Sequence, residues 1–190
     1  GHWDTAIRGN SYLRVALCRE LDHEICQLNG IASSSVYFDL EKFFDTVQID
    51  KMAAAAIKLK YPARELVLSV QMRRAARQLK AGDHYSRWTL TEKSILAGCA
   101  RLISFTRAAL YHILQHVHDR YMPFTRGQVW VDDITLMTRG TFRHATCTAA
   151  QCASDLANRL VAEGFCISAK TTVVGATKAI RDKLHGDLVL

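Results

Sequence analysis

Residues 38–45 read Phe-Asp-Leu-Glu-Lys-Phe-Phe-Asp, and residues 130–134 read Trp-Val-Asp-Asp-Ile. In each stretch a carboxylate follows a short apolar run with β character, at residues 36–38 and 129–131. An aspartate pair between two β-rich runs is a turn signal, so the second stretch predicts a hairpin with its acids at the tip. Together the two stretches predict strands that carry acidic residues to one edge of a single sheet.

The periodicity of the remaining residues predicts an α+β fold. Apolar residues recur every three or four positions from Leu13 to Leu28, which predicts an amphipathic helix over residues 4–28. Asp50 is in position to cap the next helix, and a proline at position 62 separates that helix from a third. We expect helices over residues 4–28, 52–57, 63–80, 103–121 and 142–163, and strands at residues 36–38, 84–90, 129–131, 134–137, 165–168 and 171–174.

The composition limits the class of protein. The chain of 190 residues is 49% hydrophobic, which suffices for the core of one domain or of a two-lobed unit. Its net charge of +7 favours a polyanionic partner, because clustered lysines and arginines gain affinity by releasing counterions from phosphates. No apolar run approaches the ~18 to 20 residues that cross a bilayer, and no signal pattern is visible. We therefore expect a soluble intracellular protein, nuclear or cytoplasmic, with no membrane partner.

The six cysteines indicate neither a disulfide scaffold nor a zinc site, because they lack paired spacing. Several lie in apolar helical patterns, where a buried thiol acts as a small hydrophobe. His112, His116 and His118 lie close together in the sequence, but without a Cys-x-x-Cys pair they do not favour zinc. The cysteine usage is typical of a reducing compartment.

Several patterns together resemble the catalytic core of a reverse transcriptase, of the lineage shared by group II intron proteins, retrons and non-LTR retroelements. Residues 39–45 match the family's D-x-x-x-F-F-D pattern. Residues 130–133 match its aromatic-x-D-D turn, with Trp130 where the family usually has tyrosine. Residues 164–171 resemble its Gly-Leu-x-Leu-x-x-x-Lys-Thr pattern. The resemblance covers nearly the whole chain.

The loop that begins near Gly98 departs from the family. Relatives usually read Gln-Gly-x-x-x-Ser-Pro, whereas residues 97–104 read Ala-Gly-Cys-Ala-Arg-Leu-Ile-Ser. The glutamine, which in the family helps to position template and nucleotide, is absent, and so is the proline. Gly98 still allows the backbone to approach a base pair closely.

The resemblance implies a polymerase palm, an antiparallel sheet with a ferredoxin-like or RRM-like core packed on helices, with partial fingers. The whole chain, residues 1–190, would be a partial reverse transcriptase domain. Residues 1–35 and 63–97 would form fingers-like and connecting parts, and residues 36–62 and 98–190 the palm. Because the chain starts at Gly1 and leaves no room for a thumb, we expect a fragment that is inactive or weak by itself.

The resemblance also implies two-metal nucleotidyl transfer by an RNA-directed DNA polymerase from a retroelement. Asp39 and Asp132 would be the bridging metal ligands and Asp133 a nearby third acid. Mg²⁺ would be the cofactor, with Mn²⁺ as a possible substitute, because hard cations take carboxylate oxygens. The partners would be an RNA template, a DNA primer and deoxynucleoside triphosphates. Like charges at the strand ends repel, so we expect the metal to relieve that repulsion.

The family pattern assigns nucleotide-binding roles to Leu40, Phe43, Phe44, Gly98 and Lys170. Phe44 would lie beneath the sugar of the incoming nucleotide, where its ring excludes a 2′-hydroxyl. One of the two phenylalanines must pack inward, and both are core residues by default. Lys170 would position the pyrophosphate.

Basic residues on the expected third helix form a candidate nucleic-acid-binding face. Arg73, Arg77 and Lys80 are spaced by three and four residues, so a helix through residue 80 would present them together. Such a face tracks template phosphates in one interpretation and is only solvated in the other.

Two further functions remain open at this point. A catalytically inactive palm would bind RNA or a protein partner, which the altered loop at Gly98 favours and the three retained acids disfavour. An RNA-templated RNA polymerase is disfavoured by the aromatic residue at Phe44, where that class usually has a polar residue.

Overall fold

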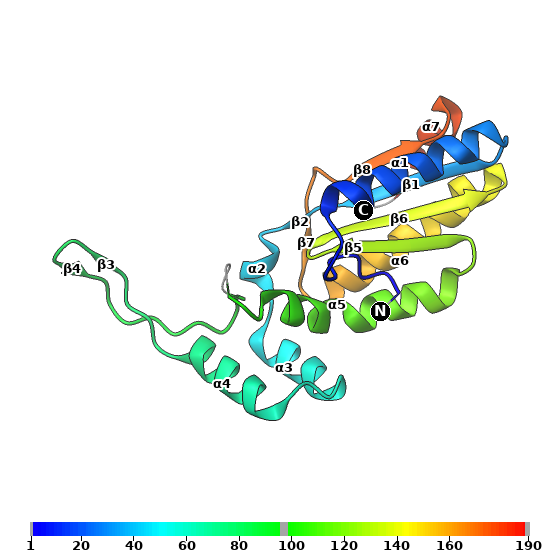
Figure 1. Cartoon of the computed structure of the whole chain (residues 1–190). Helices are drawn as coiled ribbons and strands as arrows, with labels where there is room; N and C mark the ends of the chain where they lie inside the picture. Colours follow the sequence, from blue (N-terminus) through cyan, green and yellow to red (C-terminus); the bar gives the residue numbers. More distant parts are fainter. Residues whose placement is uncertain (1, 96–98, 189–190) are drawn as a thin grey trace. The chain divides into compact units, whose positions relative to one another are not determined.

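The computed structural model describes residues 2–95 and 99–188 (Figure 1). In order, its elements are α1 (Tyr12–Leu28), β1 (Ala32–Phe38), β2 (Leu40–Glu41), α2 (Phe43–Thr46), α3 (Ile49–Lys58), α4 (Ala63–Arg74), β3 (Lys80–Ala81), β4 (His84–Tyr85), α5 (Leu102–Tyr121), β5 (Thr125–Trp130), β6 (Asp133–Gly140), the π-helical turn η1 (His144–Thr148), α6 (Ala149–Ala162), β7 (Cys166–Ile167), β8 (Thr172–Gly175) and α7 (Lys178–Asp187). They form two compact units, residues 1–41 with 113–190, and residues 42–112. The assignment of fingers and palm to particular ranges stays a prediction.

The first unit is built on a four-stranded antiparallel sheet in the order β5-β6-β1-β8. The expected hairpin is present, since Trp130 pairs with Asp133 across the turn. β1 lies beside β6, with Phe38 opposite Ile134. The register therefore brings the end of β1 to the edge that holds the hairpin turn. This arrangement confirms the predicted α+β class with an antiparallel sheet.

Helices cover both faces of this sheet. Alternate residues of a strand share a face, so Ser33, Ser35 and Tyr37 of β1 lie on the side where α1 packs. α6 runs behind the sheet in the view of Figure 1 and contacts β1 and β6. The buried side chains of α6 are small or aliphatic, with Leu156 and Leu160 fully enclosed. The apolar core of this unit therefore lies on the α6 side.

The predicted apolar face of α1 is not buried within the chain. Its large apolar residues are exposed, with Leu13 at 78% and Leu28 at 87%, and its buried residues are Arg19, His23 and Cys26. The physical reason is the composition of the sheet face that α1 meets. That face is lined by serines and a tyrosine, so the residues of α1 that pack on it are ones that can form hydrogen bonds. The helix also begins later than expected, at Tyr12.

The N-terminal residues that were expected to be helical instead lie beside the sheet. Val129 of β5 donates its amide to the carbonyl oxygen of Trp3 at 2.8 Å and accepts from the amide of Thr5 at 2.9 Å. The helix starts only after Ser11, whose side chain accepts the amide hydrogen of Arg14 at 3.2 Å. A short edge segment thus replaces the first two turns of the predicted helix.

The second unit contains α2, α3, α4 and a two-stranded hairpin, β3–β4. The break between α3 and α4 at Pro62 is as predicted. The expected cap is different, because Gln48 precedes α3 and Asp50 lies in its first turn, where it pairs with Arg74.

The helix predicted over residues 63–80 is shorter in the structure. α4 ends at Arg74, and the chain then turns extended. Arg77 pairs with Thr89 and Lys80 lies in β3, so the two residues belong to the segment of residues 77–89 that carries the hairpin, the β3–β4 arm. The expected single helical face of Arg73, Arg77 and Lys80 is therefore wrong.

The C-terminal half agrees with the predicted order of elements as far as β8, which is followed by a helix that was not predicted, α7. The expected helix over residues 142–163 is the π-turn η1 followed by α6, and it ends before Gly164, whose φ is +93°. Among the residues that the structure describes, no helix combines the length and the apolar character needed to cross a membrane.

Candidate metal and nucleotide site

The acidic edge of the sheet is built first by the turn between β5 and β6. Val131 and Asp132 form this turn, and Val131 has a φ of +61°. A positive φ at the first central residue suits a tight hairpin but is unfavourable for a β-branched side chain, at a cost of roughly 1–3 kcal/mol. The surrounding strand pairing thus holds Asp132 in the turn and Asp133 at the start of β6, against the conformational preference of Val131.

A second loop fixes the backbone at Asp39. Its carbonyl oxygen accepts the amide hydrogen of Ser168 at 2.8 Å, and its amide donates to Thr171 Oγ1 at 3.4 Å. Leu40 pairs with Ile167 in the adjoining β2–β7 ladder. These contacts bring the loop that carries Lys170 to the acidic edge.

The three carboxylates influence one another electrostatically. Burial raises the pKa of Asp132, and the charge of Asp39 raises it further. Burial also raises the pKa of Asp133, with added repulsion from Asp132 and Asp39, while Arg19 acts in the opposite direction. The structure therefore gathers like charges in a partly desolvated place, where the ionised forms are disfavoured.

A cavity of about 150 Å³ opens at this edge. Asp39, Asp133, Lys170 and Trp130 are among its lining residues. Within residues 2–95 and 99–188, no three His, Cys, Asp or Glu side chains are close enough to enclose an ion as they stand. The donor chemistry fits Mg²⁺, which is commonly held by one or two carboxylates together with waters and substrate phosphates.

Arg19 of α1 belongs to this site, and sequence reasoning missed it. Its guanidinium donates to Thr135 Oγ1 at 3.1 Å and lies over the ring of Tyr37, 4.8 Å from the centroid. The residue is only 8% exposed and lines the same cavity as Asp39. It lines the cavity together with Asp39 and Asp133, so it supplies a positive charge where the carboxylates repel.

A second polar contact supports this layer. His23 bridges two serine hydroxyls, with Nδ1 2.9 Å from Ser33 Oγ and Nε2 2.8 Å from Ser35 Oγ. Burial lowers the pKa of His23, which favours the neutral ring in this position. Arg19 and His23 are four residues apart, on the side of the helix opposite the leucines. This spacing is the sequence signal that indicates a buried polar face.

The candidate nucleotide-binding residues are spread over both units. Lys170 is exposed at the acidic edge, whereas the Leu40 side chain is buried. Phe43 and Phe44 belong to the second unit and meet edge-on, with 5.4 Å between centroids. Phe43 is 2% exposed and Phe44 is partly exposed, so Phe43 is the one that packs inward. Gly98 lies outside the described residues.

Arg73 is a structural residue of the second unit. It is buried, its guanidinium lies 4.5 Å from the centroid of Phe105, and it donates to the carbonyl oxygen of Ser69 at 3.0 Å and to Cys99 Sγ at 3.2 Å. Its side chain therefore packs within the unit and does not form an exposed phosphate-binding face.

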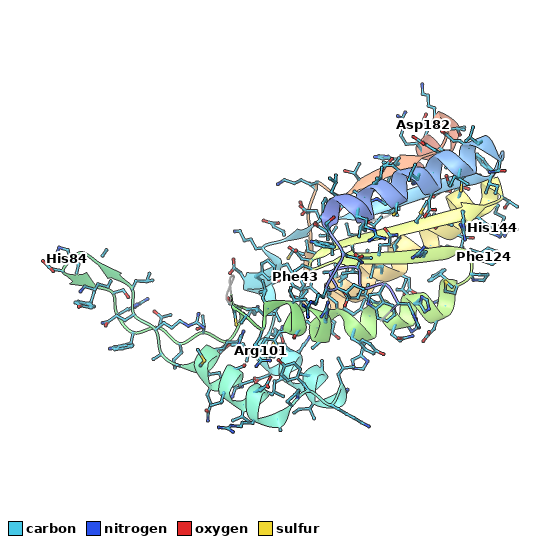
Figure 2. All side chains as sticks on the ribbon, viewed as in Figure 1. Phe43, His84, Arg101, Phe124, His144 and Asp182 are labelled. Carbon is cyan, nitrogen blue, oxygen red and sulfur yellow. The ribbon has the colours of Figure 1, made fainter. Side chains whose placement is uncertain are left out.

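The other candidate cations lie on the β3–β4 arm, with His84 near its tip (Figure 2). Lys80 and Arg87 are exposed, and Lys80 Nζ is 5.4 Å from the ring centroid of Tyr85. Tyr85 and Trp88 are also exposed, at 59% and 66%. The arm thus combines positive charge with open aromatic rings, a combination that suits single-stranded nucleic acid.

Comparison with known proteins shows the fold. No protein-family model and no curated protein matches the sequence. A solved apo telomerase from Candida tropicalis, truncated from the C-terminal domain, is similar with a TM-score of 0.65 and 14% identity, over 87% of this chain and 35% of that one. Telomerase from the same organism in complex with a TWJ fragment of telomeric RNA has a TM-score of 0.66 and 12% identity, over 89% and 30%.

The chain therefore spans about a third of the length of these telomerases. The likeness shows that it has a reverse-transcriptase-like α+β fold. The narrower resemblance to group II intron, retron and non-LTR proteins stays a prediction from the sequence.

The burial of Asp132, together with the repulsion from Asp39, predicts a stabilising substitution. A carboxyl whose folded-state pKa lies above its unfolded value of 3.8 binds more protons in the folded chain, so stability falls as the pH rises through the folded-state pKa. We expect Asp132→Asn to raise the melting temperature of the metal-free chain at neutral pH by a few degrees. The gain should shrink as the pH falls towards 3.8, where the wild-type carboxyl is also protonated.

Thermal unfolding in EDTA across this pH range measures the effect. Glu24→Gln is the matched control, because Glu24 is an exposed acid of α1 and its removal changes the net charge equally. If the Asp132→Asn chain melts at a lower temperature than both wild type and the control at neutral pH, the carboxylate at position 132 does not destabilise the metal-free fold.

Proposed function

We propose that this chain is the core of an RNA-directed DNA polymerase, which joins a deoxynucleotide to a primer 3′-hydroxyl. The observation that carries the proposal is the convergence of Asp39, Asp132 and Asp133 at one edge of the sheet, with Lys170 lining the same cavity as Asp39 and Asp133. The fold likeness to telomerase, including one solved with telomeric RNA, supports this choice. A retroelement is the proposed origin.

The proposed cofactor is Mg²⁺, with Mn²⁺ as a substitute. Asp39 and Asp132 would be the principal ligands of the metal, and Asp133 a third acid beside them. When bound, the two ions supply an activated 3′-hydroxyl and charge stabilisation at the leaving pyrophosphate. The mutual repulsion of the carboxylates supports this role, because a cation is the partner that relieves it.

The remaining residues bind and orient the nucleotide in this proposal. Lys170 lines the same cavity as Asp39, which supports the proposal that its ammonium group neutralises a phosphate of the incoming nucleotide. Phe44 is the proposed residue beneath the sugar, and its partial exposure, in contrast to the buried Phe43, suits a ring that meets a substrate.

Primer extension with an RNA template, a DNA primer, Mg²⁺ and deoxynucleotides tests the proposal, with this chain and with the longest product of its gene. Asp132→Ala should lower the rate by roughly three orders of magnitude or more, because a lost metal removes several kcal/mol of transition-state stabilisation. Phe44→Ala should preserve deoxynucleotide incorporation and raise ribonucleotide incorporation, a change in the ratio of kcat/KM values.

Each contrary result has a definite meaning. Equal loss of both activities in Phe44→Ala, with the fold intact by circular dichroism, assigns Phe44 to the core. A protein that binds the duplex but extends nothing overturns the polymerase proposal and favours the inactive palm that binds RNA or a protein.

The β3–β4 arm is the proposed binding surface for the nucleic-acid backbone, through Arg77, Lys80 and Arg87. We expect Lys80→Glu/Arg87→Glu to weaken binding of a primer–template duplex and to reduce the slope of log affinity against log salt by about 0.7–0.9 for each phosphate that the variant no longer neutralises. Titrations at several salt concentrations measure this slope.

Lys58→Glu/Arg64→Glu is the matched control, since it reverses two exposed charges on α3 and α4 of the same unit. If the arm variant and the control give the same slope, the arm is only a solvated hairpin.

A further inference from the structure

A second cavity, of about 530 Å³, lies in the first unit and shares no lining residue with the acidic site. It opens near the start of β5, and the six residues of that strand separate it from Trp130 by roughly 20 Å. Its size is within the range of small-molecule sites in proteins. The residues that matter for its chemistry are Trp3, Asp22, Met122, Phe124, Arg126 and Arg139.

The inner wall of the cavity is fixed by packing. Trp3 is 5% exposed, and its backbone is held to β5 through Val129. Its ring meets that of His118 of α5, with 5.7 Å between centroids. A wall built in this way exists before any ligand arrives, so binding does not have to order it.

The outer wall offers open apolar and aromatic surface. Phe124 stacks on His144 with 4.1 Å between ring centroids, and the two rings lie together at one end of the sheet (Figure 2). Phe124 is nevertheless 43% exposed, and Met122 is 47% exposed. A flat ring of a ligand can cover this surface, since base–aromatic stacking accepts any nucleobase.

Two guanidinium groups flank this surface. Arg126 pairs with Met137, and the amide of Arg139 donates to the carbonyl oxygen of Phe124 at 3.2 Å. By the alternation of strands, Phe124 and both arginine side chains belong to one face of the β5–β6 hairpin. Both arginines are exposed, and within the described part of the chain neither side chain has a hydrogen-bond or carboxylate partner.

Neighbouring positive charges on paired strands repel, and an anion between them would remove that repulsion. Arginine is suited to this role because its planar group binds phosphate oxygens in pairs. Asp22 is the single carboxylate among the described lining residues, and it accepts hydrogen bonds from N–H or O–H groups. The cavity therefore combines an anion site, a stacking surface and an acceptor.

We propose that this cavity binds a nucleoside monophosphate unit. Its phosphate lies on Arg126 and Arg139, its base lies against Phe124 and Met122, and Asp22 accepts a hydrogen bond from the nucleoside. The unit is either a free nucleotide or one nucleotide of a single strand, which present the same chemistry. The site does not depend on the polymerase proposal, because it uses none of the acidic residues.

Calorimetric titration of the whole chain in EDTA tests the proposal without contribution from a metal at the acidic edge. The probes are adenosine monophosphate, adenosine, inorganic phosphate and a short single-stranded oligoadenylate. Adenosine monophosphate should bind at least tenfold more tightly than adenosine or phosphate alone. If the oligoadenylate binds and its binding also requires Arg126 and Arg139, the natural ligand is one nucleotide of a single strand. If the oligoadenylate does not bind at this cavity, the natural ligand is the free nucleotide.

Variants assign the binding to the cavity. Arg126→Gln/Arg139→Gln should weaken adenosine monophosphate at least tenfold, and Phe124→Ala should weaken it without changing the affinity for phosphate. Arg14→Gln/Arg64→Gln removes two exposed arginine charges elsewhere and should bind as wild type does.

Three results would overturn the site. These are no binding of adenosine monophosphate, equal binding of phosphate and adenosine monophosphate, and unchanged binding in the cavity arginine variant. If that variant does not fold, the wild-type spectrum decides, because adenosine monophosphate must shift the Trp3 indole resonance in nuclear magnetic resonance. An unshifted Trp3 resonance at saturation overturns the proposal as well.

Discussion

The antiparallel pairing of β1 with β6 is the constraint on which the site depends. Because Phe38 lies opposite Ile134, the next residues along the two strands, Asp39 and Asp133, reach the same edge. A slip of one residue would turn every side chain of β1 to the other face of the sheet. The register is held by the apolar residues Val36 and Phe38, which are buried on the α6 side. The same core that stabilises the sheet thus forces like charges together.

The polar layer under α1 reduces part of the repulsion between the carboxylates. Arg19 offsets some of the repulsion at Asp133, and it is itself held by Thr135 and the ring of Tyr37. A buried guanidinium is costly unless it is paired, so its position is best understood together with the acids that it faces. The consequence of this arrangement is that the leucines of α1 face outward.

The parts of the fold that follow from local pattern were predictable from the sequence. The β5–β6 hairpin follows from alternation around an aspartate pair, and α5 follows from its helical period. The end of α4 was not predictable, because Ala75 to Lys80 are acceptable helix residues and only the pairing of Arg77 with Thr89 draws them into a hairpin. The buried side of α1 was also missed, since periodicity locates an apolar face but not the surface that the helix meets.

The same contrast holds for the candidate site. Its acids and Lys170 are recognisable from the resemblance to reverse transcriptases, whereas Arg19 depends on packing between a helix and a strand that only the fold reveals.

The proposed cation site formed by the three acids is tested most directly by Mn²⁺ titration followed by amide relaxation in nuclear magnetic resonance. Broadening should centre on the amides of Asp39, Asp132, Asp133 and Lys170, leave Phe124 sharp, and reverse when Mg²⁺ is added in excess. Broadening centred elsewhere, or unchanged in Asp39→Asn/Asp132→Asn, would contradict the proposed site.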